Sequence, residues 1–334
     1  MKKNYLCIIM TMILATTLML GGCSSGKKAE TKGVTNDNKS VAATLTPEPT
    51  AEANKIPIAS DWTVVADFKV SHPTNICGFL NDKRGITVGY SGEIHYTEDG
   101  GKTWPRAKNS SMCRFSLDIV NENLAWCGGN GGNVRVSKDG GKTWKAVSDI
   151  VLGGMHSGID FVDDKTGWIM TNAKLASTTD GGKTWKELTT PSESTGNAAV
   201  CLRTTEDGYL LSLNGLFFTT NDGGTTWKKH DFNFAQYEIT NIKGKPELNK
   251  GNIALADLTF TDEKNGIMVF TGIKAGEGSR TLCLTTTDGG DTWISELLPK
   301  FDGFLPAKVC LSSDGTYLTL ATSNNQTKVF RHDK

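Results

Sequence analysis

The chain has 334 residues, and its 36 Lys and Arg are balanced by 36 Asp and Glu, so the formal net charge at pH 7 is zero. This balance, without a polybasic segment, argues against nucleic acid as a partner, because surfaces that bind nucleic acid carry an excess of positive charge. The 37 glycines and only 9 prolines are typical of short strands joined by tight turns.

The first residues have the pattern of an export signal. Residues 1–3 (MKK) are positively charged, and residues 6–20 form an apolar run that is short for a membrane-spanning helix. The sequence LGGC that ends at Cys23 resembles the bacterial lipobox, which implies removal of residues 1–22 and attachment of lipid (palmitate) to Cys23. An ordinary secretory signal with an incidental cysteine is the alternative. We therefore expect a protein anchored to the cell membrane through Cys23 and facing outside the cytoplasm.

Residues 23–57 follow as a segment with almost no large apolar side chains, rich in Ser, Thr, Lys, Ala and Glu. Such a composition buries too little surface to offset the entropy lost on ordering. We expect the lipidated cysteine and a flexible linker here, and a folded domain over residues 58–334. Six cysteines fall in that domain: Cys77, Cys113, Cys127, Cys201, Cys283 and Cys310. Their scattered places in apolar runs favour mostly unpaired core thiols, although an even number in an exported protein also permits disulfides.

One motif of the form Ser/Thr-x-Asp-Gly-Gly-x-Thr-Trp occurs five times, at 97–104, 137–144, 178–185, 220–227 and 286–293. We expect each copy to be a turn, with the Asp accepting N–H groups one or two residues on, Gly supplying positive φ, and Trp entering the core. The residues concerned are Asp99, Trp104, Asp139, Trp144, Asp180, Trp185, Asp222, Trp227, Asp288 and Trp293. A motif repeated this often indicates architecture instead of catalysis.

The spacing of the motif sets the fold. Its aspartates lie 40, 41, 42 and 66 residues apart, and a period near 40 is the length of a four-stranded propeller blade. Three further strand-like runs follow Trp293, and residues 60–68 resemble a lone fourth strand. We predict an all-β, six-bladed β-propeller of antiparallel blades, closed by the N-terminal strand joining the C-terminal blade. A degenerate blade within 230–252 would make the number seven.

The repeated motif is the Asp-box, also called the bacterial neuraminidase (BNR) repeat. From about residue 60 to the end, the pattern F-x-D-x-x-x-G-W followed by DGG-x-TW resembles the photosystem II assembly/stability factor family, and it resembles sialidases and sortilin more distantly. The first resemblance implies a non-catalytic scaffold that binds another protein. No Arg-Ile-Pro motif of the sialidases is present, and the five histidines form no spaced pair. We therefore expect no catalytic residue, no cofactor and no metal site.

A binding face is predicted where the chain is longer than the repeat requires, at 230–252 and 271–280. Its candidate residues are Phe232, Phe234, Tyr237, Lys274 and Arg280. The aromatic residues suit protein contact or sugar stacking, and folding down to cover the propeller is the alternative. We expect the partner to be an exported or membrane protein. The second hypothesis is a cell-surface glycan, bound or cleaved in a sialidase-like or glycosidase reaction.

Overall fold

A computed structural model of the chain describes residues 59–333 apart from several internal gaps, the longest at 233–255. The described ranges are 59–70, 74–89, 91–109, 116–129, 133–149, 156–171, 174–194, 196–212, 214–232, 256–274, 279–299, 306–322 and 325–333. They contain 23 strands and no helix. Accordingly, this part of the chain has no helix long and apolar enough to cross a membrane. Cys23 and the predicted linker lie outside the described residues.

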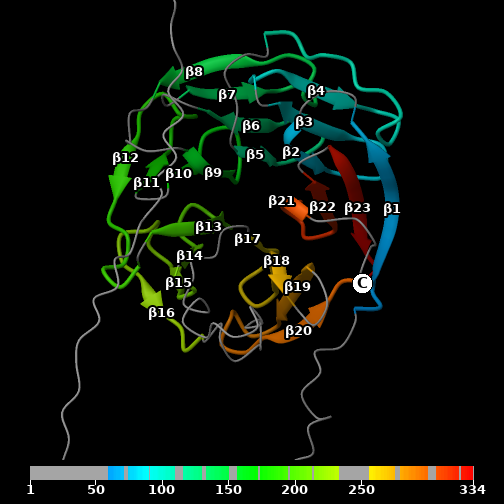
Figure 1. Cartoon of the computed structure of the whole chain (residues 1–334). Coiled ribbons are helices and arrows are strands. Elements are labelled where there is room, and N and C mark those ends of the chain that lie inside the picture. The colour runs from blue at the N-terminus through cyan, green and yellow to red at the C-terminus, as the bar shows by residue number, and fades with distance from the viewer. Residues whose placement is uncertain are drawn as a thin grey trace, which may run out of the picture. The chain divides into compact units, whose positions relative to one another are not determined.

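Six antiparallel sheets follow one another around a centre (Figure 1). Blade 1 contains β2 (Thr74–Phe79), β3 (Gly85–Gly89) and β4 (Ile94–Thr97); blade 2 contains β5 (Ser116–Ile119), β6 (Ala125–Gly128), β7 (Asn133–Ser137) and β8 (Lys145–Asp149); blade 3 contains β9 (His156–Phe161), β10 (Gly167–Thr171), β11 (Leu175–Thr178) and β12 (Lys186–Leu188). Blade 4 contains β13 (Asn197–Leu202), β14 (Gly208–Ser212), β15 (Phe217–Thr220) and β16 (Lys228–Lys229); blade 5 contains β17 (Ala256–Phe260), β18 (Gly266–Lys274), β19 (Ser279–Thr286) and β20 (Ile294–Leu297); blade 6 contains β21 (Pro306–Leu311), β22 (Tyr317–Thr322), β23 (Gln326–His332) and β1 (Trp62–Lys69). The prediction of a six-bladed propeller is confirmed.

The ring is closed by the pairing of β1 with β23, as the sequence predicted. Trp62 lies opposite His332 in this antiparallel pair, and the two rings stack with centroids 4.5 Å apart. The Asp333 N–H also donates to the Asp61 carbonyl at 2.7 Å. Joining the two ends of the domain within one sheet removes the free edges that an open ring would expose.

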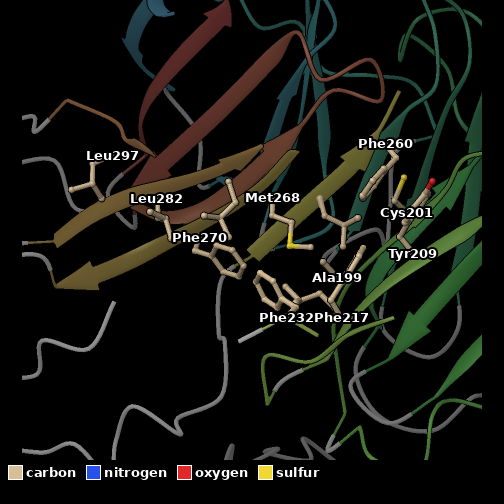
Figure 2. Close-up of a cluster of buried hydrophobic side chains, with 13 residues drawn as sticks. Ala199, Cys201, Tyr209, Phe217, Phe232, Phe260, Met268, Phe270, Leu282 and Leu297 are labelled. Atoms are coloured by element: carbon tan, nitrogen blue, oxygen red, sulfur yellow. The ribbon is translucent and has the colours of Figure 1, made fainter. Parts of the chain in front are cut away.

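The hydrophobic core is divided among the interfaces between blades. The second strand of most blades is buried along its whole length, as in β10 and β14, because neighbouring blades cover both of its faces. Figure 2 shows the cluster between blades 4 and 5, where Tyr209 and Phe260 stack with ring centroids 3.6 Å apart. Phe217 lies edge-on to the ring of Trp293 in the same cluster. The fifth Asp-box tryptophan therefore packs against blade 4.

Glycine begins the second strand where an aromatic ring lies directly over the backbone. A Cβ on Gly208 would come within 2.1 Å of the Trp168 ring, and a Cβ on Gly167 within 2.3 Å of the Phe161 ring. The φ angles of these two glycines are not in the left-handed region. Glycine is therefore required here by the close approach of ring and backbone, and not by the backbone conformation.

Blade 1 differs from the prediction of four strands, because its sheet has only three. After the first box, Arg106 makes a single bridge to His95, and Lys108 then makes a parallel bridge to Thr143 of blade 2. The Lys108 N–H donates to the Lys142 carbonyl at 2.9 Å, and the Trp144 N–H donates to the Lys108 carbonyl at 3.1 Å. The segment that should form the fourth strand is thus shared with the next blade.

The cysteines follow the favoured prediction with one exception. Cys77, Cys201, Cys283 and Cys310 are free and buried, whereas Cys127 is disulfide-bonded. Cys113 lies outside the described residues. The free thiols act as small apolar residues, and Cys310 illustrates this, since its Sγ occupies space next to Gly78 that a Cβ there would fill.

Candidate functional site

The five Asp-boxes share one set of hydrogen bonds. In the second box, Ser137 Oγ donates to Asp139 Oδ1 at 2.9 Å and accepts the Gly141 N–H at 2.8 Å. Asp139 Oδ1 accepts the Thr143 N–H, and Oδ2 accepts the Thr143 hydroxyl at 2.6 Å. The Asp therefore bonds to the N–H four residues on, and the expectation of one or two residues was wrong. The whole turn, and not only its first bend, is closed by this side chain.

Hydrogen bonds within each box lower the pKa of its Asp and so favour the charged carboxylate at neutral pH. The hydroxyl of the threonine four residues on is the largest cause that lowers the pKa of each of four box aspartates to about 2, followed by that residue's N–H. These four are Asp99, Asp180, Asp222 and Asp288. A carboxylate so committed to local donors is not free to act as a general acid.

The box tryptophans brace the turns from within. Both box glycines have positive φ in every copy, and the indole N–H donates back to the carbonyl of the second one at 2.9 to 3.0 Å in four boxes. Trp227 differs and donates to the Thr189 carbonyl of blade 3. Trp144 is buried, and the others are partly buried. The interpretation of the boxes as architecture agrees with this geometry.

The structure describes only some of the residues of the predicted binding face. Phe232 was predicted either to be exposed for binding or to fold down onto the propeller, and the second alternative holds: it is 5% exposed and packs in the cluster between blades 4 and 5. Its ring lies edge-on to Phe217 and Trp293, so burial of apolar surface, and not a ligand, explains it. Phe234 and Tyr237 lie outside the described residues. Lys274 and Arg280 stand on the paired ends of β18 and β19, where Lys274 is opposite Ser279 and Arg280 opposite Ile273.

Three acidic side chains that sequence reasoning missed lie on the inner strands around the centre. Asp118 on β5 accepts the Phe161 N–H of blade 3 at 2.8 Å, and Asp160 on β9 accepts the Leu202 N–H of blade 4 at 2.6 Å. Asp257 on β17 accepts the Leu311 N–H of blade 6 at 2.7 Å. Each carboxylate therefore ties one blade to the next. The recurrence of Asp just before the end of the first strand, in SLDIV and GIDFV, was the available signal.

These carboxylates line a central cavity of about 420 Å³, together with Cys201, Arg203 and residues 311–314. Burial raises the pKa of Asp257 to about 6 and that of Asp160 to about 7. Burial, followed by the negative charge of Asp160, raises the pKa of Asp118 well above its ordinary value. Within the described part of the chain, no group of His, Cys, Asp and Glu is arranged to hold a metal ion. The observed role of these three carboxylates is to accept backbone N–H groups from neighbouring blades.

A second hollow, of about 760 Å³, lies where blade 1 lacks its fourth strand. It is lined by Asn109, Arg135, Val136, Lys138, Thr143, Trp144, Lys145 and Ala146. Among the described residues, the lining contains three cationic side chains and no carboxylate, whereas the chain as a whole is neutral. We refer to it as the blade 1–2 groove. Sequence reasoning missed it because the groove depends on the departure of residues 105–109 from the regular blade.

The comparisons with known proteins agree with the fold. A family model described as the photosynthesis system II assembly factor YCF48 matches residues 149–233, and the BNR/Asp-box repeat model matches residues 135–146. No curated protein matches the chain in sequence.

Several solved structures share the architecture. A structure titled YCF48 bound to D1 peptide is 17% identical with a TM-score of 0.54, covering 84% of this chain and 99% of that one. YCF48 from Cyanidioschyzon merolae is 18% identical with a TM-score of 0.49, covering 82% and 99%. The WD40 repeats of RRP9 are 8% identical with a TM-score of 0.54, covering 83% and 99%. At these identities the likeness concerns the fold. The chain is an Asp-box β-propeller that resembles the YCF48 photosystem II assembly factors, with the family model matched over residues 149–233.

Proposed function

We propose that the protein is a lipid-anchored, extracytoplasmic propeller that binds another exported or membrane protein, as a scaffold or assembly factor, without catalysing a reaction. The observation that carries this proposal is the match of residues 149–233 to the YCF48 assembly factor model. The structure titled YCF48 bound to D1 peptide supports it, since that propeller was captured with a peptide. The charged state of the box aspartates, each bonded within its own turn, also favours a structural use of the repeated motif.

The anchor belongs to the same proposal. Lipid on Cys23 would hold the chain at the membrane, and the linker over residues 24–57 would separate the propeller from it. A flexible chain of this length has a root-mean-square span of roughly 30 Å. The propeller then reaches partners close to the bilayer surface, which suits a protein that acts on newly exported chains.

Cross-linking of the tagged full-length chain in membranes of its native host tests the proposal. The control is the signal and residues 23–57 fused to an unrelated exported domain, which reproduces the anchor without the propeller. We expect a specific exported or membrane protein to be cross-linked to the propeller and absent from the control, and to bind the purified full-length chain directly. Retention of the same proteins by chain and control, or direct binding of glycan alone, would contradict it.

A further inference from the structure

We propose that the blade 1–2 groove is a docking site for an acidic, extended segment of the partner protein. The inference rests on the proposed function and specifies the chemistry of its partner. Its first support is charge: Arg135, Lys138 and Lys145 line the groove, and its described lining contains no carboxylate. Lys138 Nζ is paired with Asp164 at 2.8 Å, so Arg135 and Lys145 are the lining cations that make no ion pair with the described residues.

The second support is the state of Arg135. Its Nη1 donates to the Asn109 carbonyl at 3.3 Å, but its Nε is buried and has no hydrogen-bond partner among the described residues. A buried N–H of a charged group that lacks an acceptor is costly. A carboxylate in the groove would bind the Nη side of the planar guanidinium, a charge-assisted contact that offsets part of this cost.

The third support is that this position is apolar and buried in three of the five boxes. The residue four before the box Asp is Ala176 in blade 3, Phe218 in blade 4 and Leu284 in blade 5, and all three are buried. Those side chains fill inter-blade clusters, whereas the matching residue is the half-buried His95 in blade 1 and Arg135 in blade 2. Burial of apolar surface alone would favour another apolar residue here. In blade 2 a charged guanidinium therefore takes the place of apolar area and holds the Asn109 carbonyl beside the groove.

The shape of the occupant follows from the chain's own segment beside the groove. Lys108 adds to the outer edge of the second box as a parallel bridge, with hydrogen bonds to Lys142 and Trp144. This edge therefore already accepts one extended strand, which turns away at Asn109, whose φ is 56°. The groove continues along Lys145 and Ala146 of β8. An extended peptide fits this geometry through backbone pairing, and its acidic side chains would supply specificity.

The test uses the full-length chain in a non-ionic detergent and a fluorescein-labelled peptide of alternating Glu and Ser, with Gln replacing Glu in the control peptide. Fluorescence anisotropy should show the Glu peptide binding at least about tenfold more tightly than the Gln peptide, because hydrogen bonds to charged groups are stronger. Affinity should fall with added salt. The substitutions Arg135→Gln and Lys145→Glu should each weaken binding about tenfold.

The matched control is Lys186→Glu, which makes the same charge change at the same position of the third box, one residue after its Trp. It should change the affinity less than twofold. Lys145 is exposed, so Lys145→Glu should leave the thermal unfolding midpoint unchanged and its effect cannot come from misfolding. Equal losses in the two lysine variants, equal binding of the two peptides, or competition only by anionic phospholipid vesicles would overturn the inference. If a cross-linked partner binds the Lys145→Glu variant as tightly as the parent chain, the inference is overturned and the proposed function still stands.

Discussion

At the scale of single residues, the Asp-box joins local and non-local interactions in eight positions. Its Ser or Thr, Asp and second Thr satisfy the backbone N–H groups of the turn, and the glycines supply the positive φ that other residues adopt at a cost. The Trp carries the largest apolar side chain of the box into contact with another blade. Trp144 shows this, since it packs with Ile94 and Ala107 of blade 1.

Truncation of Trp144 separates these contributions. Trp144 is 2% exposed and its indole N–H donates to the Gly141 carbonyl at 2.9 Å. We expect Trp144→Ala to lower the free energy of unfolding by about 3–5 kcal/mol, as for other buried aromatic residues. Trp144→Phe should cost about 1–2 kcal/mol less than that, since the ring remains and only one hydrogen bond and part of the apolar area are lost. Denaturant unfolding followed by circular dichroism measures both, and a cost below about 1 kcal/mol for Trp144→Ala would show that the box Trp does not brace the blades.

At the scale of elements, the inner strands are tied together by carboxylates that hold raised pKa values. Asp118, Asp160 and Asp257 each accept an N–H from the next inner strand in the ring. In blade 4 the thiol of Cys201 stands in the corresponding position, near the Phe260 N–H. Around the same cavity, Arg203 is paired with Asp207 and lies 3.7 Å from Glu263, two carboxylates that are not part of the described cavity lining.

The pH dependence of stability should report on this ring. Burial raises the pKa of Asp160 to about 7, above the ordinary value of about 3.9 that applies in the unfolded chain. Between these values the folded state keeps a proton that the unfolded state has released, so the contribution of Asp160 to stability is complete at low pH and is lost as the pH rises to about 7. Asp160→Asn should remove this dependence and still accept the Leu202 N–H. At pH 8 the variant should be more stable than the parent by up to roughly 4 kcal/mol, because about three pKa units each correspond to about 1.4 kcal/mol, and the difference should become small near pH 4.

The control for this measurement is Asp164→Asn. Asp164 is exposed, and its hydrogen bond with Lys138 lowers its pKa, so its contribution is present above about pH 4 and is lost only in more acidic solution. Urea unfolding at pH 4, 6 and 8 compares the two variants with the parent chain. If Asp160→Asn and Asp164→Asn shift stability in the same direction at pH 8, the buried carboxylate is not the source of the effect.

The sequence predicted the elements whose determinants are local. Five boxes at regular spacing set the blades, and the unboxed strands at each end set the closure. The features that the sequence did not predict depend on contacts between residues that are far apart in the chain. The sequence left open whether Phe232 is exposed or folded down, because its segment departs from the repeat, and the cluster that contains Phe217 and Trp293 decides for burial. The blade 1–2 groove likewise follows from the pairing of Lys108 with Thr143, 35 residues later. The periodicity of the repeat does not predict this pairing.

At the scale of the whole molecule, the propeller is closed by one non-covalent contact, the pairing of β1 with β23, which we call the seam. Blades 1 to 5 are each built from consecutive strands, but blade 6 takes β1 from one end of the domain and β21, β22 and β23 from the other. Loss of this pairing would open the ring and expose the clusters on both sides. The stability of the seam should therefore govern cooperative unfolding of the domain, because each blade buries its faces against two neighbours.

Two substitutions on β1 test this dependence. Trp62 is 5% exposed and stacks on His332, whereas Val64, two residues on, is 39% exposed. We expect Trp62→Ala to lower the free energy of unfolding by about 3–5 kcal/mol and to shift the single transition of the whole domain. Val64→Ala on the same strand should change stability by no more than about 0.5 kcal/mol. Hydrogen exchange adds the decisive observation: opening of the seam should expose amides of β2 and β17, far from the substitution, together with those of β23. Faster exchange confined to β1 and β23 would mean that the outer strand frays alone and that the ring stays closed without it.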